Sequence, residues 1–363
     1  MGRKSIREAG RKIVEGWTEK QVWESMSQFS ENKAPLIETT PAVGTYHRAI
    51  NVMAKMTAVW AFLVICLGGL TKSKEAGLTI AEPIYYKFNW EWFFVENLNA
   101  EYTHRTFVAI LSGLTLLTAG LVFWKDKRRS VNRLAGGMLL GLLAQAVLGA
   151  MTVAYFAKAK TSIPHAALGQ VFFCMAVAMC VVTSKRWIES GTALRSRENP
   201  ALSKLALWTV IAMFVQLLLG AALRHDDQAQ AMREGRFGIF AWHLTAHMLG
   251  AFAVVYFVSR VLFRVFRDHR SQPEILKPAR LIMMLLGVQI LLGFGAGVLK
   301  VITLDEAHSP PPLRVLVATT HLAVGALIFA AGVTLALRTH RFILSAPAVE
   351  EQADRAKLAG VTA

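Results

Sequence analysis

Eight long runs of apolar residues dominate the sequence, and short polar segments separate them. Each run is close to the roughly 20 residues that a helix needs to cross a hydrocarbon core of about 30 Å. The runs lie near residues 51–71, 104–124, 134–156, 165–184, 205–223, 237–259, 281–302 and 315–337. The pattern predicts an all-α polytopic membrane protein with eight transmembrane helices, whose outer surfaces contact membrane lipid.

Composition supports this class, and the distribution of charge indicates the orientation. Of the 363 residues 54% are hydrophobic and the mean hydropathy is +0.40, which excludes an ordinary soluble domain. Suppose that both termini lie on one side of the membrane, together with every connection from an even-numbered helix to the next odd-numbered one. That side then holds 29 of the 40 Lys and Arg residues, and the other side holds 11. This asymmetry predicts a multi-pass protein of the cell inner (cytoplasmic) membrane with both termini cytoplasmic. The net charge of +16 is therefore no sign of a nucleic-acid partner.

The polar segments fit this topology. Residues 1–47 form the predicted cytoplasmic N-terminal segment, and residues 341–363 the cytoplasmic tail. The basic clusters at 125–129 and 260–280 are interpreted as topology signals that contact anionic lipid. No signal peptide is expected in residues 1–47, where apolar residues at helical spacing predict a surface helix instead. These residues are Ile6, Ala9, Ile13 and Trp17.

The ends of the odd-numbered helices repeat a short motif. Each of these helices closes on Leu-Gly, and three of them carry Gln one turn earlier. The following even-numbered helix then carries a histidine, which indicates a repeated two-helix hairpin. The glycines are Gly68, Gly149, Gly220 and Gly293, and the histidines are His104, His165, His247 and His321. We expect two pseudo-repeated four-helix bundles, 48–186 and 203–340, with two histidines in each.

Paired histidines inside a helical bundle are typical of heme ligation. Two facing helices can offer one imidazole each to opposite sides of an iron porphyrin, in an apolar slot. A single membrane histidine is more often a packing residue, but four at matching places favour ligands. Copper or zinc fits less well, because those ions usually gather three or four ligands in one place. The small residues near the helix ends would let a flat macrocycle approach the backbone, although close helix packing explains them equally.

The two bundles differ in charge next to their first histidine. Glu101 and Arg105 flank His104 at the point where the chain enters lipid, while His247 has neither neighbour. Ionisable residues at such a place mark a functional site, although Arg105 as an interfacial anchor is an alternative. Proton-handling chemistry needs a positioned carboxylate, so the first bundle is expected to be the reactive one. The second bundle resembles a site for a structural or electron-transferring cofactor.

The ordered set of motifs resembles the heme A synthase family over roughly residues 48–340. The motifs are Leu67-Gly68-Gly69-Leu70-Thr71-Lys72 with Glu75-Ala76-Gly77-Leu78-Thr79-Ile80, Glu101-Tyr102-Thr103-His104-Arg105, Ile163-Pro164-His165-Ala166-Ala167-Leu168-Gly169-Gln170, Gly220-Ala221-Ala222-Leu223-Arg224-His225 and Thr320-His321-Leu322-Ala323-Val324-Gly325-Ala326-Leu327. The resemblance implies oxidation of a ring methyl of heme O to the formyl group of heme A, by successive hydroxylation and loss of water. It implies a role in cytochrome oxidase assembly.

Residue roles follow from the same resemblance. His104 and His165 would be axial ligands of the substrate heme, and Glu101 the catalytic carboxylate. His247 and His321 would hold a permanently bound heme b. The substrate would come from the upstream farnesylating enzyme, and the electron acceptor and the oligomeric state stay open.

Three further residues and one rival ligand belong to this interpretation. Arg105 and Arg224 are expected to contact heme propionates, because guanidinium binds carboxylate in bidentate fashion. His225 is either a propionate or relay contact or a solvated loop residue. His243 is a rival to His247, since Met248 stands where the family usually has Arg. The first outer loop also lacks the cysteine pair of some relatives, so a disulfide-based electron route is not expected.

Two other functions remain open on the residues alone. One is a di-heme b-type electron-transfer protein, linked to quinol, that does not modify heme. It would not need Glu101. The other is a transporter built on repeats, with the histidines as a proton relay.

Overall fold

The computed structural model describes residues 36–40, 42–73, 96–154, 159–189, 191–196, 200–225, 237–303 and 310–345. Eight long helices in this part of the chain are apolar enough to cross a membrane, as predicted. They are α3 (Arg48–Ser73), α4 (Glu96–Lys125), α5 (Arg129–Ala154), α6 (Ala159–Val182), α8 (Leu202–His225), α10 (Phe237–Asp268), α11 (Pro273–Ile302) and α12 (Pro312–Phe342). The chain is therefore a multi-pass membrane protein. Most helices run past the apolar runs, since their polar ends add turns outside the hydrocarbon core.

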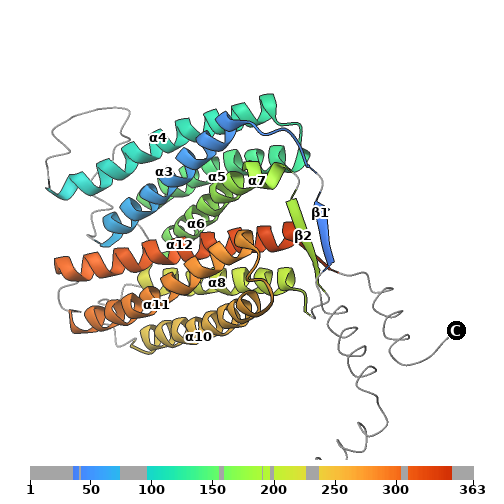
Figure 1. Cartoon of the computed structure of the whole chain (residues 1–363). Helices are drawn as coiled ribbons and strands as arrows, with labels where there is room; N and C mark the ends of the chain where they lie inside the picture. The colour runs from blue at the N-terminus through green and yellow to red at the C-terminus, as the bar shows by residue number, and fades with distance from the viewer. Residues whose placement is uncertain are drawn as a thin grey trace, which may run out of the picture.

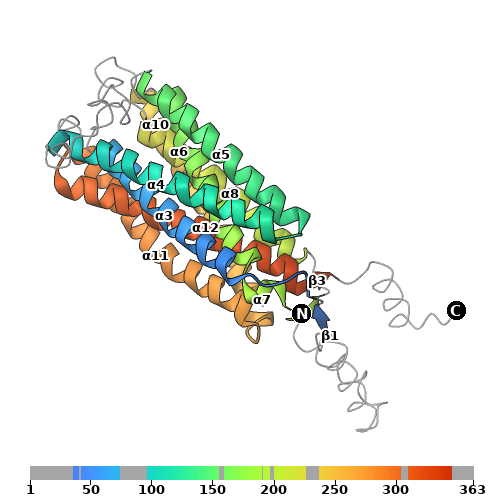
Figure 2. The same ribbon diagram turned by 90° about the horizontal axis from the view of Figure 1, so that it is seen from above.

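The long helices pack as two groups of four. In the first group α3 packs on α4, α4 on α5, α5 on α6, and α6 returns to α3. In the second group α8, α10, α11 and α12 close a ring in the same way. Figures 1 and 2 show the two groups side by side, and contacts of α12 with α3 and α6, and of α6 with α8, join them. This packing is that of two four-helix bundles, and their predicted sequence boundaries remain a prediction.

Large apolar side chains cover the outside of both bundles, as expected for lipid contact. On α11 and α10 the exposed residues include Leu291, Phe294 and Phe252. The inside is formed by smaller residues at helical spacing, such as Ala54, Ala58 and Ala61 on α3. In a membrane, moving a large apolar side chain from lipid into the protein interior gives little free energy, because both surroundings are apolar. Small residues that permit close backbone approach hold the helices together instead.

A three-stranded sheet lies at one end of the bundles and was not expected from the sequence. Its strands are β1 (Leu36–Thr40), β2 (Gly191–Ser196) and β3 (Ile343–Ser345). β2 is the central strand, antiparallel to β1 and parallel to β3. The all-α prediction is confirmed for the eight spans, while short parts of the predicted N-terminal segment, the linker and the tail are strands instead. The predicted surface helix around Ile6–Trp17 lies outside the described residues.

The sheet ties together three chain segments at the end where both predicted cytoplasmic flanks lie (Figure 2). β1 precedes the first bundle, β2 follows the short helix α7 (Lys185–Ile188) between the bundles, and β3 follows α12. Each strand is short and lacks a long alternation of polar and apolar residues, so the sequence pattern did not predict the strands. Both described chain flanks therefore emerge at one end, as an even number of spans requires.

Ion pairs at this end involve residues of the basic clusters. In the turn after α4, the Arg128 side chain donates to both carboxylate oxygens of Asp126, at 2.9 Å (Nε to Oδ1) and 2.6 Å (Nη2 to Oδ2). Its Nη1 also donates to the backbone carbonyl of Val182 on α6, at 2.8 Å. Asp126 is 5% exposed. Arg128 is therefore a structural link between α4 and α6 as well as part of a topology signal.

Asp126→Asn is expected to lower the thermal stability of the purified protein. Hydrogen bonds to charged groups contribute about 1.5–3 kcal/mol each, and the amide cannot replace the paired carboxylate. Burial raises the pKa of Asp126, but hydrogen bonds from the Arg128 side chain and backbone outweigh this, so its pKa is lowered from 3.8. The stabilisation is then complete above pH 3.8 and lost as the pH falls through the lower pKa of the folded state. Melting curves of both proteins should converge below that pH, and equal melting temperatures at pH 7 would contradict this role.

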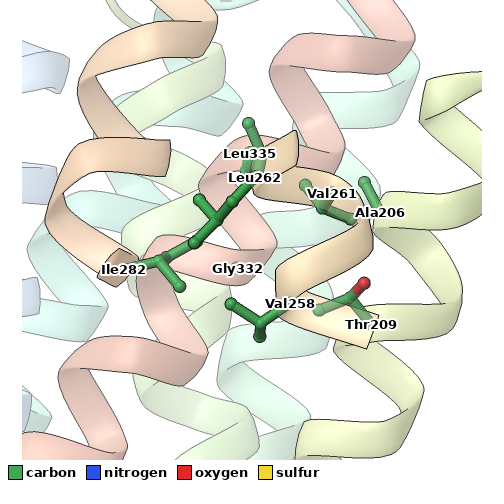
Figure 3. A pocket seen from close by; sticks show the side chains of 8 residues that line it. All are labelled: Ala206, Thr209, Val258, Val261, Leu262, Ile282, Gly332 and Leu335. Atoms are coloured by element: carbon green, nitrogen blue, oxygen red, sulfur yellow. The ribbon is translucent and has the colours of Figure 1, made fainter. Parts of the chain in front are cut away.

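A small apolar cavity lies between the helices of the second bundle (Figure 3). Its volume of about 10 Å³ is at the limit for a single water molecule. No charged side chain lines the cavity, so no charged group is present there to bind a polar ligand. The lining residues are Ala206, Thr209, Val258, Val261, Leu262, Ile282, Gly332 and Leu335.

Candidate functional site

The four predicted histidines occupy equivalent places in four helical hairpins. Each lies near the start of an even-numbered span. These spans begin at the end of the bundles opposite to the sheet (Figure 1). The ring of each histidine lies beside the glycine of the preceding helix. A Cβ atom built on that glycine would lie 2.9–3.3 Å from the Cε1 atom of the histidine. Such spacing leaves no room for a side chain. The pairs are Gly68 with His104, Gly149 with His165, Gly220 with His247 and Gly293 with His321.

Glutamines one turn before three of these glycines hold the histidine helices. Gln145 Nε2 donates to the backbone carbonyl of His165 at 3.0 Å, and Gln216 Nε2 to that of His247 at 2.9 Å. In the fourth hairpin Gln289 Nε2 lies 3.4 Å from Nε2 of His321. The repeated glutamine thus fixes the position of the even helix against the odd one. In the first hairpin Val64 takes this place, and His104 interacts with its backbone.

The two histidines of one bundle lie near enough to each other to interact electrostatically. This holds for His104 and His165 in the first bundle, and for His321 and His247 in the second. In each bundle the two histidines come from different hairpins, so packing of the hairpins brings together residues that are far apart in sequence. These interactions agree with the grouping that the repeat predicted, and the pairing of the histidines as heme ligands remains a proposal.

The environment of the rings suits ligands to a buried metal. Each of the four side chains is half-buried. Nδ1 of His104, His165 and His321 is enclosed, and among the described residues it has no hydrogen-bond partner that meets strict geometry. Buried polar atoms without partners are costly, so these rings are held in place for a reason other than packing. Imidazoles beside glycines of apolar helices are the ligand type and the surroundings that an iron porphyrin takes in helical bundles.

A charged group distinguishes the first bundle. Glu101 is 4% exposed and forms an ion pair with Arg105, one turn further along α4. Arg105 was predicted to contact a heme propionate, but its guanidinium contacts Glu101 here. Further along the same helix, Phe107 stacks on Trp60 with ring centroids 4.8 Å apart, and Trp60 Nε1 donates to the Phe107 carbonyl at 2.9 Å. The carboxylate is thus held by Arg105 one turn before His104, and the aromatic pair lies further along the same helix.

The second bundle has no carboxylate beside its histidines among the described residues. His247, not His243, contacts Gly220 and Gln216 and interacts with His321. The geometry thus favours His247 over its rival. Met248, which stands where the family usually has arginine, is 54% exposed on the outer face of α10.

Arg224, the other residue predicted to contact a propionate, lies at the end of α8. Its side chain donates to Gly69 and Ser73 of α3 and to Ala318 of α12. Sequence reasoning did not predict this contact between bundles, because a hydrogen bond across 155 positions leaves no local pattern. The side chain of His225 lies outside the described residues.

The chain is thus a multi-pass helical membrane protein in which four of the spans each carry a histidine beside a glycine of the preceding helix. The family model described as cytochrome oxidase assembly protein, COX15-CtaA, matches residues 83–309. The chain belongs to this family and has a role in cytochrome oxidase assembly. No curated protein matches the chain.

Proposed function

We propose that the protein is a heme A synthase, which oxidises a ring methyl of heme O to the formyl group of heme A. The observation that carries the proposal is the pairing of His104 with His165 in the first bundle, beside the buried carboxylate of Glu101. Membership of a cytochrome oxidase assembly family supports it, because this reaction supplies a heme to such an oxidase. The protein is then an oxidoreductase whose substrate comes from the upstream farnesylating enzyme.

In this proposal the first bundle is the reactive site. His104 and His165 would hold the substrate heme from opposite faces, and their glycine neighbours keep both rings oriented. Glu101 would accept protons or position water next to the methyl group, and Arg105 holds the carboxylate in place. Trp60 and Phe107 would form an apolar wall that limits access of bulk water.

The second bundle would hold a permanent heme b between His247 and His321. When bound, this cofactor supplies one-electron chemistry. Gln216 and Gln289 keep the two imidazoles in place, which is the usual task of groups around metal ligands. The absence of a nearby carboxylate among the described residues fits an electron-transferring site better than a proton-handling one.

Location and orientation complete the proposal. The excess of Lys and Arg on the sheet side places the sheet and both chain flanks in the cytoplasm, in the cell inner membrane. The histidine pairs then lie toward the outer leaflet. The two bundles, 48–186 and 203–340, correspond to a substrate unit and a cofactor unit.

A di-heme b-type electron-transfer protein is the second candidate. The two similar histidine pairs favour it, since both bundles can hold heme in the same way. It does not explain why a buried carboxylate paired with arginine lies beside only one of them. A transporter with a histidine relay explains neither the glycine contacts nor the paired imidazoles.

Chromatography of extracted hemes separates these functions. The protein is expressed in a host without its own heme A synthase but with a supply of heme O, and the hemes are extracted and identified. A synthase yields heme A and its hydroxylated precursor. An electron carrier leaves all hemes unchanged, and a transporter contains no heme, so either result would end the proposal.

Gly220→Ala is expected to weaken retention of the heme in the second bundle. The new methyl group would lie 3.0 Å from Cε1 of His247, so the ring must shift, and overpacking of this kind costs about 1–3 kcal/mol. This corresponds to roughly a five- to 150-fold loss in affinity. Heme content per chain after purification measures the effect. Gly297→Ala is the matched control, because nothing lies within 4 Å of a Cβ there, and equal heme loss in both variants would show that the contact is unimportant.

A further inference from the structure

Arg224 bridges the two bundles at the end where the histidines lie. Its Nη2 donates to the backbone carbonyl of Gly69 and to Oγ of Ser73, both at 2.7 Å. Its Nη1 donates to the carbonyl of Ala318 at 3.3 Å. Gly69 and Ser73 belong to α3 of the first bundle, whereas Ala318 lies on α12 of the second. One side chain from α8 therefore binds helices of both bundles.

On the first-bundle side these hydrogen bonds hold the turn of α3 that lies beside His104, a predicted heme ligand. We call the glycine beside a predicted histidine ligand the seat of that histidine. Gly69 directly follows Gly68, whose backbone touches the His104 ring. Arg224 thus holds the turn of α3 against which that imidazole rests. Ser73 lies one turn further and is also 3.3 Å from the hydroxyl of Thr319 on α12.

On the second-bundle side Arg224 is equally close to the histidine pair. It follows Gly220, the seat of His247, by one turn of α8. Ala318 precedes His321 by one turn of α12, and Arg224 interacts electrostatically with His321. The glycine beside His247, on α8, and the helix that carries His321, α12, are thereby connected through one guanidinium to the first site.

The helices also approach too closely at this point for independent movement. A Cβ on Gly69 would lie 2.5 Å from Cδ2 of Leu322 and 3.7 Å from Cγ2 of Thr319. The guanidinium itself is partly buried, and its hydrogen-bond acceptors in the described part of the chain are neutral. Burying part of a cation there costs free energy. A neutral side chain could form the same hydrogen bonds at a lower desolvation cost, so hydrogen bonding alone does not explain an arginine at this position.

We propose that Arg224 is a positioning residue that couples the two heme sites, so that filling the second site prepares the first for its substrate. The inference rests on the proposed function, because it takes both histidine pairs as heme sites. Its charge favours the reduced form of the second-site heme, since the oxidised form carries one more positive charge. Its hydrogen bonds fix the His104 seat relative to the second site. Such coupling is reciprocal in binding free energy.

The test compares Arg224→Gln, Arg224→Lys, Ser73→Ala and the control Arg314→Gln in purified protein with its second site loaded. Arg314 is an arginine at the same end that donates only to Thr303 of the second bundle in the described structure, at 2.9 Å to the carbonyl. Two quantities are measured without turnover. One is the affinity of the first site for added heme b, followed by absorbance under anaerobic conditions, and the other is the reduction potential of the second-site heme.

Each variant has a distinct expected result. Arg224→Gln lowers the potential and weakens heme b binding at the first site by about tenfold or more, as the loss of charged hydrogen bonds predicts. Arg224→Lys restores the potential but not the affinity. Ser73→Ala weakens the affinity at unchanged potential, and Arg314→Gln leaves the affinity as in wild type.

The proposal is overturned if Arg224→Gln keeps the first-site affinity within twofold of wild type, or if Arg314→Gln loses as much. Should Arg224→Gln fail to fold, the lysine and Ser73 variants decide the question in the same way. Because neither readout requires conversion of heme O, the coupling can hold while the synthase activity fails, and the reverse.

Discussion

Replacing Glu101 by alanine is expected to reduce formation of heme A by about 100-fold or more while heme binding persists. The carboxylate is 4% exposed, lies one turn before His104 and is held by Arg105. General acid-base groups in such positions contribute about 10²- to 10⁴-fold to a rate. Nothing else among the described residues of the first bundle offers a carboxylate at this place. Heme A and its hydroxylated precursor, separated by chromatography after a timed supply of heme O, give the rate.

Two further variants show whether the charge or the shape of Glu101 matters. Glu101→Gln keeps the size of the side chain but cannot take up a proton. Its rate of heme A formation should therefore be reduced as much as that of the alanine variant. Arg105→Ala removes the ion-pair partner of the Glu101 carboxylate but keeps the carboxylate itself, so this variant should retain part of the activity. If the alanine and glutamine variants both formed heme A at the wild-type rate, Glu101 would have no catalytic role, and the electron-transfer alternative would gain support.

Replacing His104 and His165 together by alanine is expected to abolish binding of heme O and hence all conversion. The two imidazoles interact electrostatically within the first bundle, and loss of both removes the two proposed ligands of the substrate heme. The second site should keep its heme, because its own histidines and glutamines lie in other hairpins. Absorbance titration with heme O measures the first site, and the heme content before addition measures the second.

His340→Ala serves as the control for this double variant, since that histidine is exposed at the opposite end of α12. It should bind and convert heme O as wild type does. Unchanged binding of heme O to the double variant would show that the first pair does not hold the substrate. The bundle would then need another site, and the proposed roles of Glu101 and Arg105 would lose their basis.

The spans and the histidine pairs could be predicted from sequence because both leave periodic signals. A membrane helix must satisfy its backbone within one apolar run, so length and hydropathy are sufficient to find it. The recurrence of Leu-Gly before each histidine predicted which residues share an environment, and the structure shows that glycine and histidine touch in all four hairpins. The membership in a heme A synthase type of family, predicted from the same motifs, is confirmed by the match to residues 83–309.

Contacts between distant segments could not be predicted in this way. Arg224 was expected at a propionate, and its bonds to Gly69 and Ala318 depend on how the two bundles meet. Arg105 forms an ion pair with Glu101, one turn away on the same helix, and its expected contact with a propionate remains a prediction. The three-stranded sheet joins segments that are 149 or more residues apart, and its strands are too short for an alternation to be visible.

One histidine outside the site is buried although it lies next to a basic cluster. His269, at the end of the sixth span, is 3% exposed. Its backbone amide donates to the carbonyl of Val265 at 3.0 Å, so the chain turns back here before α11 begins. Position next to a basic cluster suggested solvent, whereas the tight turn between two long helices encloses the ring.

The central claim is that a pair of imidazoles inside a bundle holds a heme. Low-temperature near-infrared magnetic circular dichroism of the purified protein tests it most directly in the second bundle, where the heme is proposed to be permanent. This measurement recognises a low-spin heme with two imidazole ligands. We predict one such heme in wild type as purified, which persists in His104→Ala/His165→Ala and in His243→Ala and is lost in His247→Ala/His321→Ala. Persistence of the signal in the last variant, or its loss in His243→Ala, would contradict the account.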